Sequence, residues 1–463
     1  MSSSETVHRP QPEGTRDIIS ALPLELLIHI VEFLAPEDII QSQRVSKNWR
    51  TIFSNDKIIT AVLRETFKFL GLDAEGVITE DTTADATSYF RWRYGLQHGR
   101  PIKQILLPWP EDFRDFMDLP DLIEYKSRRL CYELREDNSV RLVNLENGEI
   151  STWTGNEFGS LYNLNLSDRY IFILSKQWDS NCYDLTAHDI HTKQRFDQQV
   201  PASEYFQSSI VEDKVVIAPM PHSQSAPVYI WDLSSNDVHE IGGFSNLWLY
   251  HMDAVQNVLV AFEIDWEKQP PEVNQTKWTM TTGQQLDKKT FHLPIPKDRL
   301  DRELALEPSC NFGHKTVSQI FSEKHTTIHL EYDHTLDRLD LRWIHGAEQF
   351  RRNPYKCHST YMTPYLVCRW TWRTGPLIIY DAATGRATQQ SKISLHKDEN
   401  DYSNPDLRGS ISEFDIPGLL CFGDREVLGL RGDRGVQFWF FNPNFTPYLP
   451  NLEELSDSDE IFD

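Results

Sequence analysis

Residues 22–38 read Leu22-Pro-Leu-Glu-Leu-Leu-Ile-His-Ile-Val-Glu-Phe-Leu-Ala-Pro-Glu-Asp38, and they decide the fold of the N-terminal region. Their apolar side chains recur at steps of three and four, which predicts one helical stripe. The stripe comprises Leu22, Leu26, Ile30 and Phe33, with Leu27 and Leu34 beside it. Pro23 stands at the start of the helix, where its missing N–H costs nothing. Pro36 ends this helix and opens the next one.

Two more short helices are expected after Pro36. The second runs through Ile39, Ile40 and Val45, and Ser46 caps a third that contains Trp49. Three short helices in about forty residues bury only a small core. Such a unit usually keeps an apolar surface for a partner. We therefore predict a helical unit over residues 18–70.

The order of these residues resembles the F-box family. The matching positions are Leu22-Pro23-x-Glu25-Leu26-Leu27, Ile30, Phe33-Leu34, Pro36-x-Asp38, Val45-Ser46 and Trp49-Arg50. The match covers roughly residues 18–60, about a tenth of the chain. Ser46 is a mild departure, because the family often has Cys there. The alternative is an ordinary three-helix cap that packs on its own β domain.

The F-box resemblance implies docking to the adaptor subunit of an SCF (adaptor–cullin–F-box) ubiquitin ligase, and through it to a cullin. On this interpretation much of the adaptor contact is made by Leu22, Pro23, Leu26, Leu27, Ile30 and Pro36. Val45 and Trp49 divide between the core of the unit and the interface.

Residues 102–450 repeat one pattern, a hydrophobic strand that ends in a polar residue, followed four residues later by Gly, Asn or Lys. It occurs at Val140–Asn144, Ala187–Asp189, Val228–Asp232, Lys277–Thr279 and Leu377–Asp381. Asp or Asn caps a tight turn by accepting from backbone N–H groups, and Gly or Asn supplies a positive φ at its end. The period of about 40–45 residues is typical of propeller blades.

Completing the ring requires two more units and one borrowed strand. Leu339–Trp343 is expected to fill the gap before Asp381, and Val436–Asn442 follows a polar insertion around Ser391–Gly409. Little chain remains after Asn442 for an outer strand. We expect Ile102–Leu107 to supply it and so join early and late segments.

The repeated units resemble WD-repeat blades, with Trp231-Asp232 and Tyr380-Asp381 at the position of the Trp-Asp dipeptide. The glycine-histidine partner of that dipeptide is missing from most units, so kelch-like and quinoprotein-like propellers stay open. The predicted fold class is α+β multidomain: a small three-helix F-box unit followed by an all-β propeller of seven blades, with six or eight as alternatives.

The remaining segments and the overall charge limit the possible partners. Residues 1–17 are expected to be disordered, residues 71–101 to be a connector with room for one helix, and residues 451–463 to be an acidic, mobile tail. A net charge of −23 disfavours nucleic acid and membrane surfaces. The sequence has neither a secretory signal nor an apolar run long enough to span a bilayer. We expect a cytoplasmic or nuclear protein whose six scattered cysteines are free thiols in strands.

No catalytic or metal-binding motif stands out. His325-Thr-Thr-Ile-His329 has the zincin spacing, but it lacks the Glu, and its β-branched residues favour a strand. There is no Gly-x-Ser-x-Gly elbow and no phosphate loop. We therefore expect no cofactor, no metal and no enzymatic activity.

Arg369-Trp-Thr-Trp-Arg373 is the candidate target-binding segment. Alternation puts Arg369 and Arg373 on one face of a strand and the two tryptophans on the other. The tryptophans then fill space between blades, and the arginines are candidates to bind an acidic or phosphorylated target. The predicted function is target recognition for an SCF-type ubiquitin ligase. The alternatives are an F-box scaffold that acts outside a ligase and a propeller enzyme.

Overall fold

The computed structural model describes two compact units, within residues 1–94 and 95–463. The described residues are 17–34, 36–72, 78–109, 122–134, 138–154, 159–177, 180–201, 206–219, 226–244, 247–295, 304–306, 310–312, 315–322, 327–344, 357–371, 377–382, 386–389, 421–432, 435–448 and 453–454. No helix in these ranges combines the length and the apolar character that crossing a membrane requires.

The N-terminal unit is helical. Its elements are η1 (Ile19–Ala21), α1 (Leu24–Val31), α2 (Pro36–Ser42), α3 (Lys47–Phe53), α4 (Asp56–Phe69) and α5 (Glu80–Ala84), and α6 (Ala86–His98) runs across the boundary. Pro36 opens α2 as predicted, and the predicted cap of α3 is confirmed, because Ser46 Oγ accepts a hydrogen bond from Trp49 N at 3.1 Å. Val45 was wrongly included in the second helix. It lies in the turn after α2, where its N–H donates to Ser42 O.

Helix α4 supplies the centre of the helical core. Its side chains Ile58, Val62, Leu63 and Phe67 are at most 1% exposed, and they belong to one cluster with Leu27, Val31, Ile39 and Phe53. The helical unit therefore contains more than the three predicted helices. Residues 71–101, predicted as a connector with room for one helix, contain α5 and α6.

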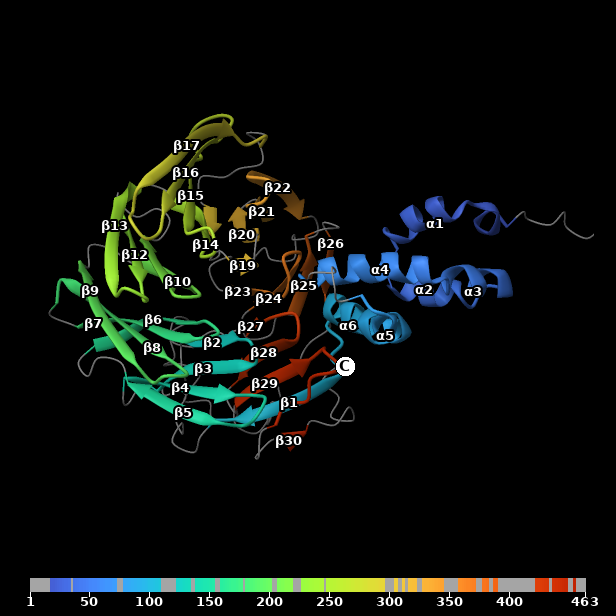
Figure 1. Ribbon diagram of the computed structural model, residues 1–463, viewed down its shortest axis with the longest axis horizontal. Helices are drawn as coiled ribbons and strands as arrows, with labels where there is room; N and C mark the ends of the chain where they lie inside the picture. The colour runs from blue at the N-terminus through green and yellow to red at the C-terminus, as the bar shows by residue number, and fades with distance from the viewer. Residues whose placement is uncertain are drawn as a thin grey trace, which may run out of the picture. The chain divides into compact units, whose positions relative to one another are not determined.

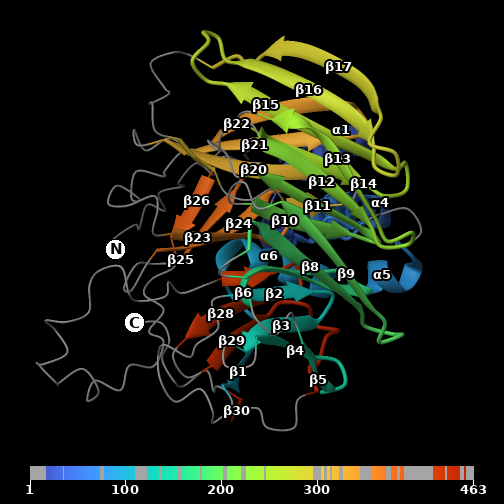
Figure 2. The same ribbon diagram turned by 90° about the vertical axis from the view of Figure 1, so that its left-hand side faces the viewer.

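The second unit is a β-propeller, and the seven sheets that its described residues form follow one another around a ring (Figure 1). The first blade comprises β2 (Ile123–Lys126), β3 (Arg129–Leu134), β4 (Ser139–Asn144) and β5 (Ile150–Thr154), and the second comprises β6 (Gly159–Leu166), β7 (Tyr170–Gln177), β8 (Cys182–Asp189) and β9 (Arg195–Pro201). The third blade comprises β10 (Phe206–Val211), β11 (Lys214–Pro219), β12 (Ala226–Asp232) and β13 (Asp237–Phe244). The fourth comprises β14 (Leu247–Asp253), β15 (Val258–Asp265), β16 (Glu272–Thr279) and β17 (Gln285–His292). Figure 2 shows these four blades in succession.

The last three blades complete the ring. The fifth blade comprises β18 (Leu304–Leu306), β19 (Cys310–Phe312), β20 (Lys315–Ser322), β21 (Thr327–Asp333) and β22 (Arg338–Ile344). The sixth comprises β23 (Cys357–Tyr361), β24 (Leu366–Thr371), β25 (Leu377–Asp381) and β26 (Arg386–Gln389). The seventh combines β27 (Cys421–Gly423), β28 (Val427–Gly432) and β29 (Gly435–Phe440) with β1 (Lys103–Pro108) and β30 (Glu453–Glu454). The buried apolar clusters lie mostly between neighbouring sheets.

The predicted turn chemistry is confirmed in four blades. The polar residue and its partner four positions later are Asn144 and Gly148, Asp189 and Lys193, Asp232 and Asn236, and Thr279 and Gly283. Every partner has a positive φ, between 62° and 74°. Asp189 Oδ1, for example, accepts from the backbone N–H groups of His191 and Thr192 at 2.9 Å. The fifth predicted partner, Gly385 after Asp381, lies outside the described residues.

The prediction for the fifth blade was wrong by one strand. Leu339–Trp343 lies in β22, the outer strand, whereas the repeat position belongs to β21, which ends at Asp333. The signal was hidden because Asp337, rather than Gly, Asn or Lys, takes the left-handed conformation in this blade.

The predicted closure of the ring is confirmed. Strand β1 pairs antiparallel with β29 along its whole length, from Lys103 opposite Phe440 to Pro108 opposite Gly435. Beyond β1, Glu453 and Glu454 form β30, so these two residues of the predicted mobile tail are paired with Leu106 and Ile105. The six cysteines all lie in strands, as expected.

Candidate functional site

The helical unit exposes a group of large apolar side chains close together in the sequence. They are Ile18 (70% exposed), Leu26 (49%), Ile30 (36%), Phe33 (89%) and Val45 (63%), and we call these five residues the apolar surface. A soluble unit rarely leaves so many large apolar groups in water without a partner.

Helix α1 explains how this surface coexists with a closed core. Leu27 and Val31 point inward and are 4% and 1% exposed, whereas Leu26, Ile30 and Phe33 follow one another at steps of four and three on another side. A helix that only covers a core needs one apolar face. Helix α1 has a second one, which its own unit does not bury.

The predicted contact residues fall into three groups in the structure. Leu26, Ile30, Val45 and Pro23 are exposed, whereas Leu22 and Trp49 are half-buried. The other two, Leu27 and Pro36, are buried.

Leu27 and Pro36 are buried in the helical unit, and their part in adaptor contact stays a prediction. Leu27 belongs to the core cluster around α4, so it shapes the unit from within. Phe33 and Ile18 were not among the predicted contact residues. Ile18 extends the four-residue spacing of Leu22 and Leu26 backwards, and this signal was available in the sequence.

Trp49 anchors the start of the helical unit. Its Nε1 donates to both carboxylate oxygens of Asp17, at 2.9 and 3.0 Å, while its ring packs against the core. Asp17 also accepts from the N–H and hydroxyl groups of Ser20. The hydrogen bonds from Ser20, and then that from Trp49, hold the pKa of Asp17 below its usual value. Asp17, assigned to the disordered lead-in, is therefore tied to α3.

The candidate target-binding arginines are only partly described. Arg369 lies in β24, opposite Ser359 and Ile378 in the neighbouring strands, and its side chain lies outside the described residues. Arg373 lies outside them entirely. The structure therefore leaves the arginine pair as a prediction.

The predicted strand around His329 is present, but its histidine does not face solvent. His329 lies in β21 and is fully buried, whereas His325 lies outside the described residues. Burial, followed by the charges of Arg342 and Lys315, lowers the pKa of His329 to about 3.

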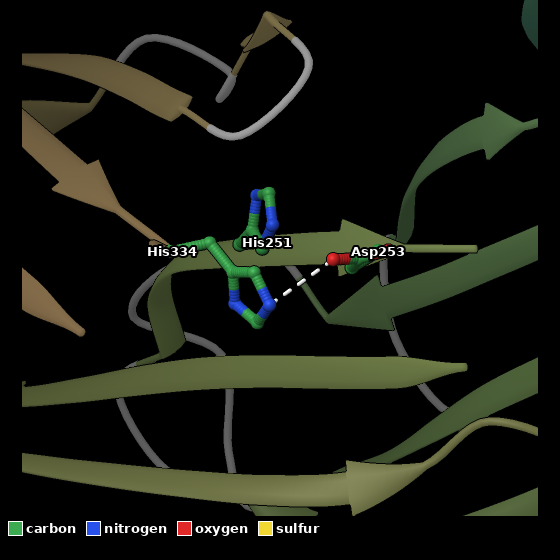
Figure 3. A group of neighbouring side chains, drawn as sticks. All are labelled: His251, Asp253 and His334. Carbon is green, nitrogen blue, oxygen red and sulfur yellow. Dashed lines mark ion pairs between the residues drawn. The ribbon is translucent and has the colours of Figure 1, made fainter. Parts of the chain in front are cut away.

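One group among the described residues has donors suited to a metal ion, namely His251, Asp253 and His334 (Figure 3). No motif in the sequence predicted this group. The only local signal is the His-x-Asp pair in β14, because the third member comes from the next blade.

Solved structures similar to this chain share little sequence identity with it. No curated protein matches the chain. The propeller domain of Myceliophteria thermophila Cps50 (Swd1) is similar at 11% identity and a TM-score of 0.44, over 69% of this chain and 96% of that one. Kuenenia stuttgartiensis hydrazine synthase is similar at 11% identity and a TM-score of 0.38, over 57% and 76%.

The family comparison concerns the helical unit. Residues 19–63 match the family model described as F-box-like. This range contains α1 to α3, most of α4 and four members of the apolar surface. The chain therefore carries an F-box-like domain at residues 19–63, followed by a β-propeller.

Proposed function

We propose that this chain is the target-recognition subunit of an SCF-type ubiquitin ligase. The F-box-like domain binds the adaptor subunit, and through it a cullin, while the propeller binds the target protein. One observation carries the proposal: five large apolar side chains between residues 18 and 45 stay exposed on a unit whose core is already closed.

The exposure values rank the contributions to adaptor binding. Complete burial of a large apolar side chain is worth about 1.5–3 kcal/mol. Phe33, at 89% exposed, has the most area to lose and is the expected anchor, and the exposed Leu26 and Ile30 of α1 precede it in the sequence. Binding hot spots are typically a few such residues at the centre of an interface.

No catalytic step is assigned to this chain. Its contribution is proximity, because a target held by the propeller stays within reach of the ubiquitin-conjugating enzyme elsewhere in the complex. Within the propeller, Arg369 and Arg373 are the residues proposed to bind an acidic or phosphorylated target. We place this activity in the cytoplasm or nucleus, where ubiquitin ligases of this type act.

The adaptor contact is tested with purified adaptor subunit and the full-length chain. Leu26→Glu and Phe33→Glu put a charge into the proposed contact, and each is expected to weaken adaptor binding at least 100-fold in calorimetry. Leu286→Glu is the matched control, since Leu286 in β17 is 52% exposed and Leu26 is 49% exposed. Equal affinities for the three variants, or no binding by the wild type, would contradict the proposal.

Adding the cullin to the same assay separates a ligase subunit from a scaffold. A complex that contains chain, adaptor and cullin supports the ligase, whereas an adaptor complex that excludes the cullin supports the scaffold.

Target binding is tested with the Arg369→Ala/Arg373→Ala variant against acidic and phosphorylated peptides. Unchanged peptide affinity would remove the arginines from the proposal.

A further inference from the structure

His251, Asp253 and His334 form a compact group at the junction of the fourth and fifth blades. His251 and Asp253 lie two residues apart in β14, so both side chains leave the same face of the sheet. His334 directly follows β21 of the next blade. Figure 3 shows the three side chains converging.

The donor atoms are close enough to share one ion. One donor from each residue lies within 4.8 Å of the other two, and His334 Nε2 is 3.0 Å from Asp253 Oδ2. The two imidazole rings stack with their centroids 5.0 Å apart. Zinc–ligand bonds of about 2.0–2.2 Å place neighbouring ligands roughly 3.3 Å apart. Small side-chain rotations therefore suffice to bring the three donors around one ion.

Each member of the group is held by a further contact. His251 Nδ1 lies 2.7 Å from Thr316 Oγ1, and Asp253 Oδ1 accepts from Gln256 N at 2.8 Å. Gln256 Oε1 lies 3.0 Å from His334 Nε2. Contacts of this kind orient ligands in metal sites and are a usual part of such sites.

Burial distinguishes this group from a chance surface cluster. His251 is fully buried, and the side chains of His334 and Asp253 are 9% and 17% exposed. The ring nitrogen of His334 that faces Asp253 and Gln256 is Nε2, so Nε2 is the atom placed to bind an ion between these residues.

We propose that His251, Asp253 and His334 bind one divalent transition-metal ion, with Zn²⁺ the best match, and that this ion links the fourth and fifth blades. Two imidazoles and a carboxylate suit zinc, whereas Ca²⁺ and Mg²⁺ prefer oxygen ligands. Gln256 Oε1 or a water molecule takes the fourth position. The site goes beyond the proposed function, because adaptor binding by the apolar surface does not require it.

The test uses the full-length chain, stripped with a chelator and titrated with Zn²⁺ alone. We expect one tightly bound ion per chain. His334→Gln and Asp253→Asn are each expected to weaken that binding at least 100-fold. His191→Gln is the control, because His191 is an exposed histidine of the second blade, and its affinity should equal that of the wild type.

A second measurement separates lost binding from lost folding. Without metal, the wild type and His334→Gln should both melt cooperatively, which shows that the variant is folded. Zn²⁺ should raise the melting temperature of the wild type and His191→Gln only. Co²⁺ should give the intense visible absorption of a tetrahedral site in the same two proteins. Equal Zn²⁺ affinity in the wild type and His334→Gln, or no bound ion in the wild type, would overturn the proposal.

Discussion

Arg128 and Glu426 form an ion pair across 298 residues of sequence, with Arg128 Nε 2.7 Å from Glu426 Oε2 and Nη2 3.1 Å from Oε1. Arg128 lies in the turn between β2 and β3, and Glu426 lies between β27 and β28. The guanidinium group also stands over the Phe445 ring, 4.5 Å from its centroid. Burial raises the pKa of Glu426, but the hydrogen bond and charge of Arg128 outweigh it and hold this pKa below its usual value. The pair therefore joins the first blade to the last.

Replacing Arg128 should loosen this junction. Arg128→Met keeps the length of the side chain but leaves Glu426 largely buried without its cation, so we expect a loss of about 1–3 kcal/mol in the free energy of unfolding. Urea unfolding followed by tryptophan fluorescence measures it. Arg195→Met is the matched control, since Arg195 is 34% exposed against 31% for Arg128 and pairs with Asp197 on its own strand. The control should change the free energy of unfolding by less than about 0.5 kcal/mol. Equal losses in Arg128→Met and Arg195→Met would show that the pair between the first and last blades does not stabilise the propeller.

Gly283 should not tolerate a side chain. Its φ is 63°, and a Cβ there would lie 3.1 Å from Ile241 Cγ2 of the third blade. A left-handed non-glycine residue costs about 1–2 kcal/mol, so Gly283→Ala should lower the free energy of unfolding by at least that amount in the urea assay. Gly242→Ala provides the comparison, because a Cβ at Gly242 meets nothing within 4 Å. A loss at Gly242 as large as that at Gly283 would contradict the conformational explanation.

Ser46 should stabilise the start of α3. Removing its hydroxyl in Ser46→Ala deprives Trp49 N of its acceptor, which costs about 1 kcal/mol for a typical N-cap. Amide hydrogen exchange should become faster in α3 and unchanged in the propeller. Ser54→Ala, at the other end of the same helix, should leave the exchange rates as they are. Unchanged hydrogen-exchange rates of α3 in Ser46→Ala would show that the cap does not stabilise this helix.

His329 should make the propeller sensitive to acid. Its pKa is about 3 in the folded protein and near 6.5 when unfolded, so the unfolded chain binds a proton below pH 6.5 that the folded chain does not. Stability is therefore lost as the pH falls below 6.5, by about 2 kcal/mol at pH 5. His329→Leu should lose correspondingly less between pH 7 and pH 5 in urea unfolding. The exposed-site variant His191→Gln should follow the wild type; a His329→Leu protein with the wild-type pH dependence would contradict the assignment.

Local chemistry made much of the propeller predictable. A polar residue followed four positions later by a left-handed one specifies the turn in the first five blades, and these positions marked the repeat correctly at Asp189 and Asp232. The fifth blade was misassigned because Asp337 replaces the expected Gly, Asn or Lys. There the side chain of Asp337 pairs with Lys277 of the fourth blade, a contact between blades that no local pattern reports.

Both candidate sites were only partly predictable from the sequence, because packing between distant segments decides which residues meet. The four-residue spacing in α1 identified the apolar residues, but burial by α4 decided which of them face inward, as Leu27 does, and which face solvent, as Leu26 does. The histidine group needs His334 beside β14. That neighbour follows from the packing of two blades, which the sequence spacing does not encode.

The pairing of β1 with β29 cannot form until the last blade has been synthesised. Gln104 and Gln437 are hydrogen-bonded across this pair, 333 residues apart. At about 5–20 residues per second, a ribosome needs roughly 15–70 s to travel from one strand to the other. During that interval β1 is a strand without its neighbour, and such an edge attracts other chains. We therefore expect slow translation to lower the yield of this protein more than that of a protein whose blades each close from adjacent sequence.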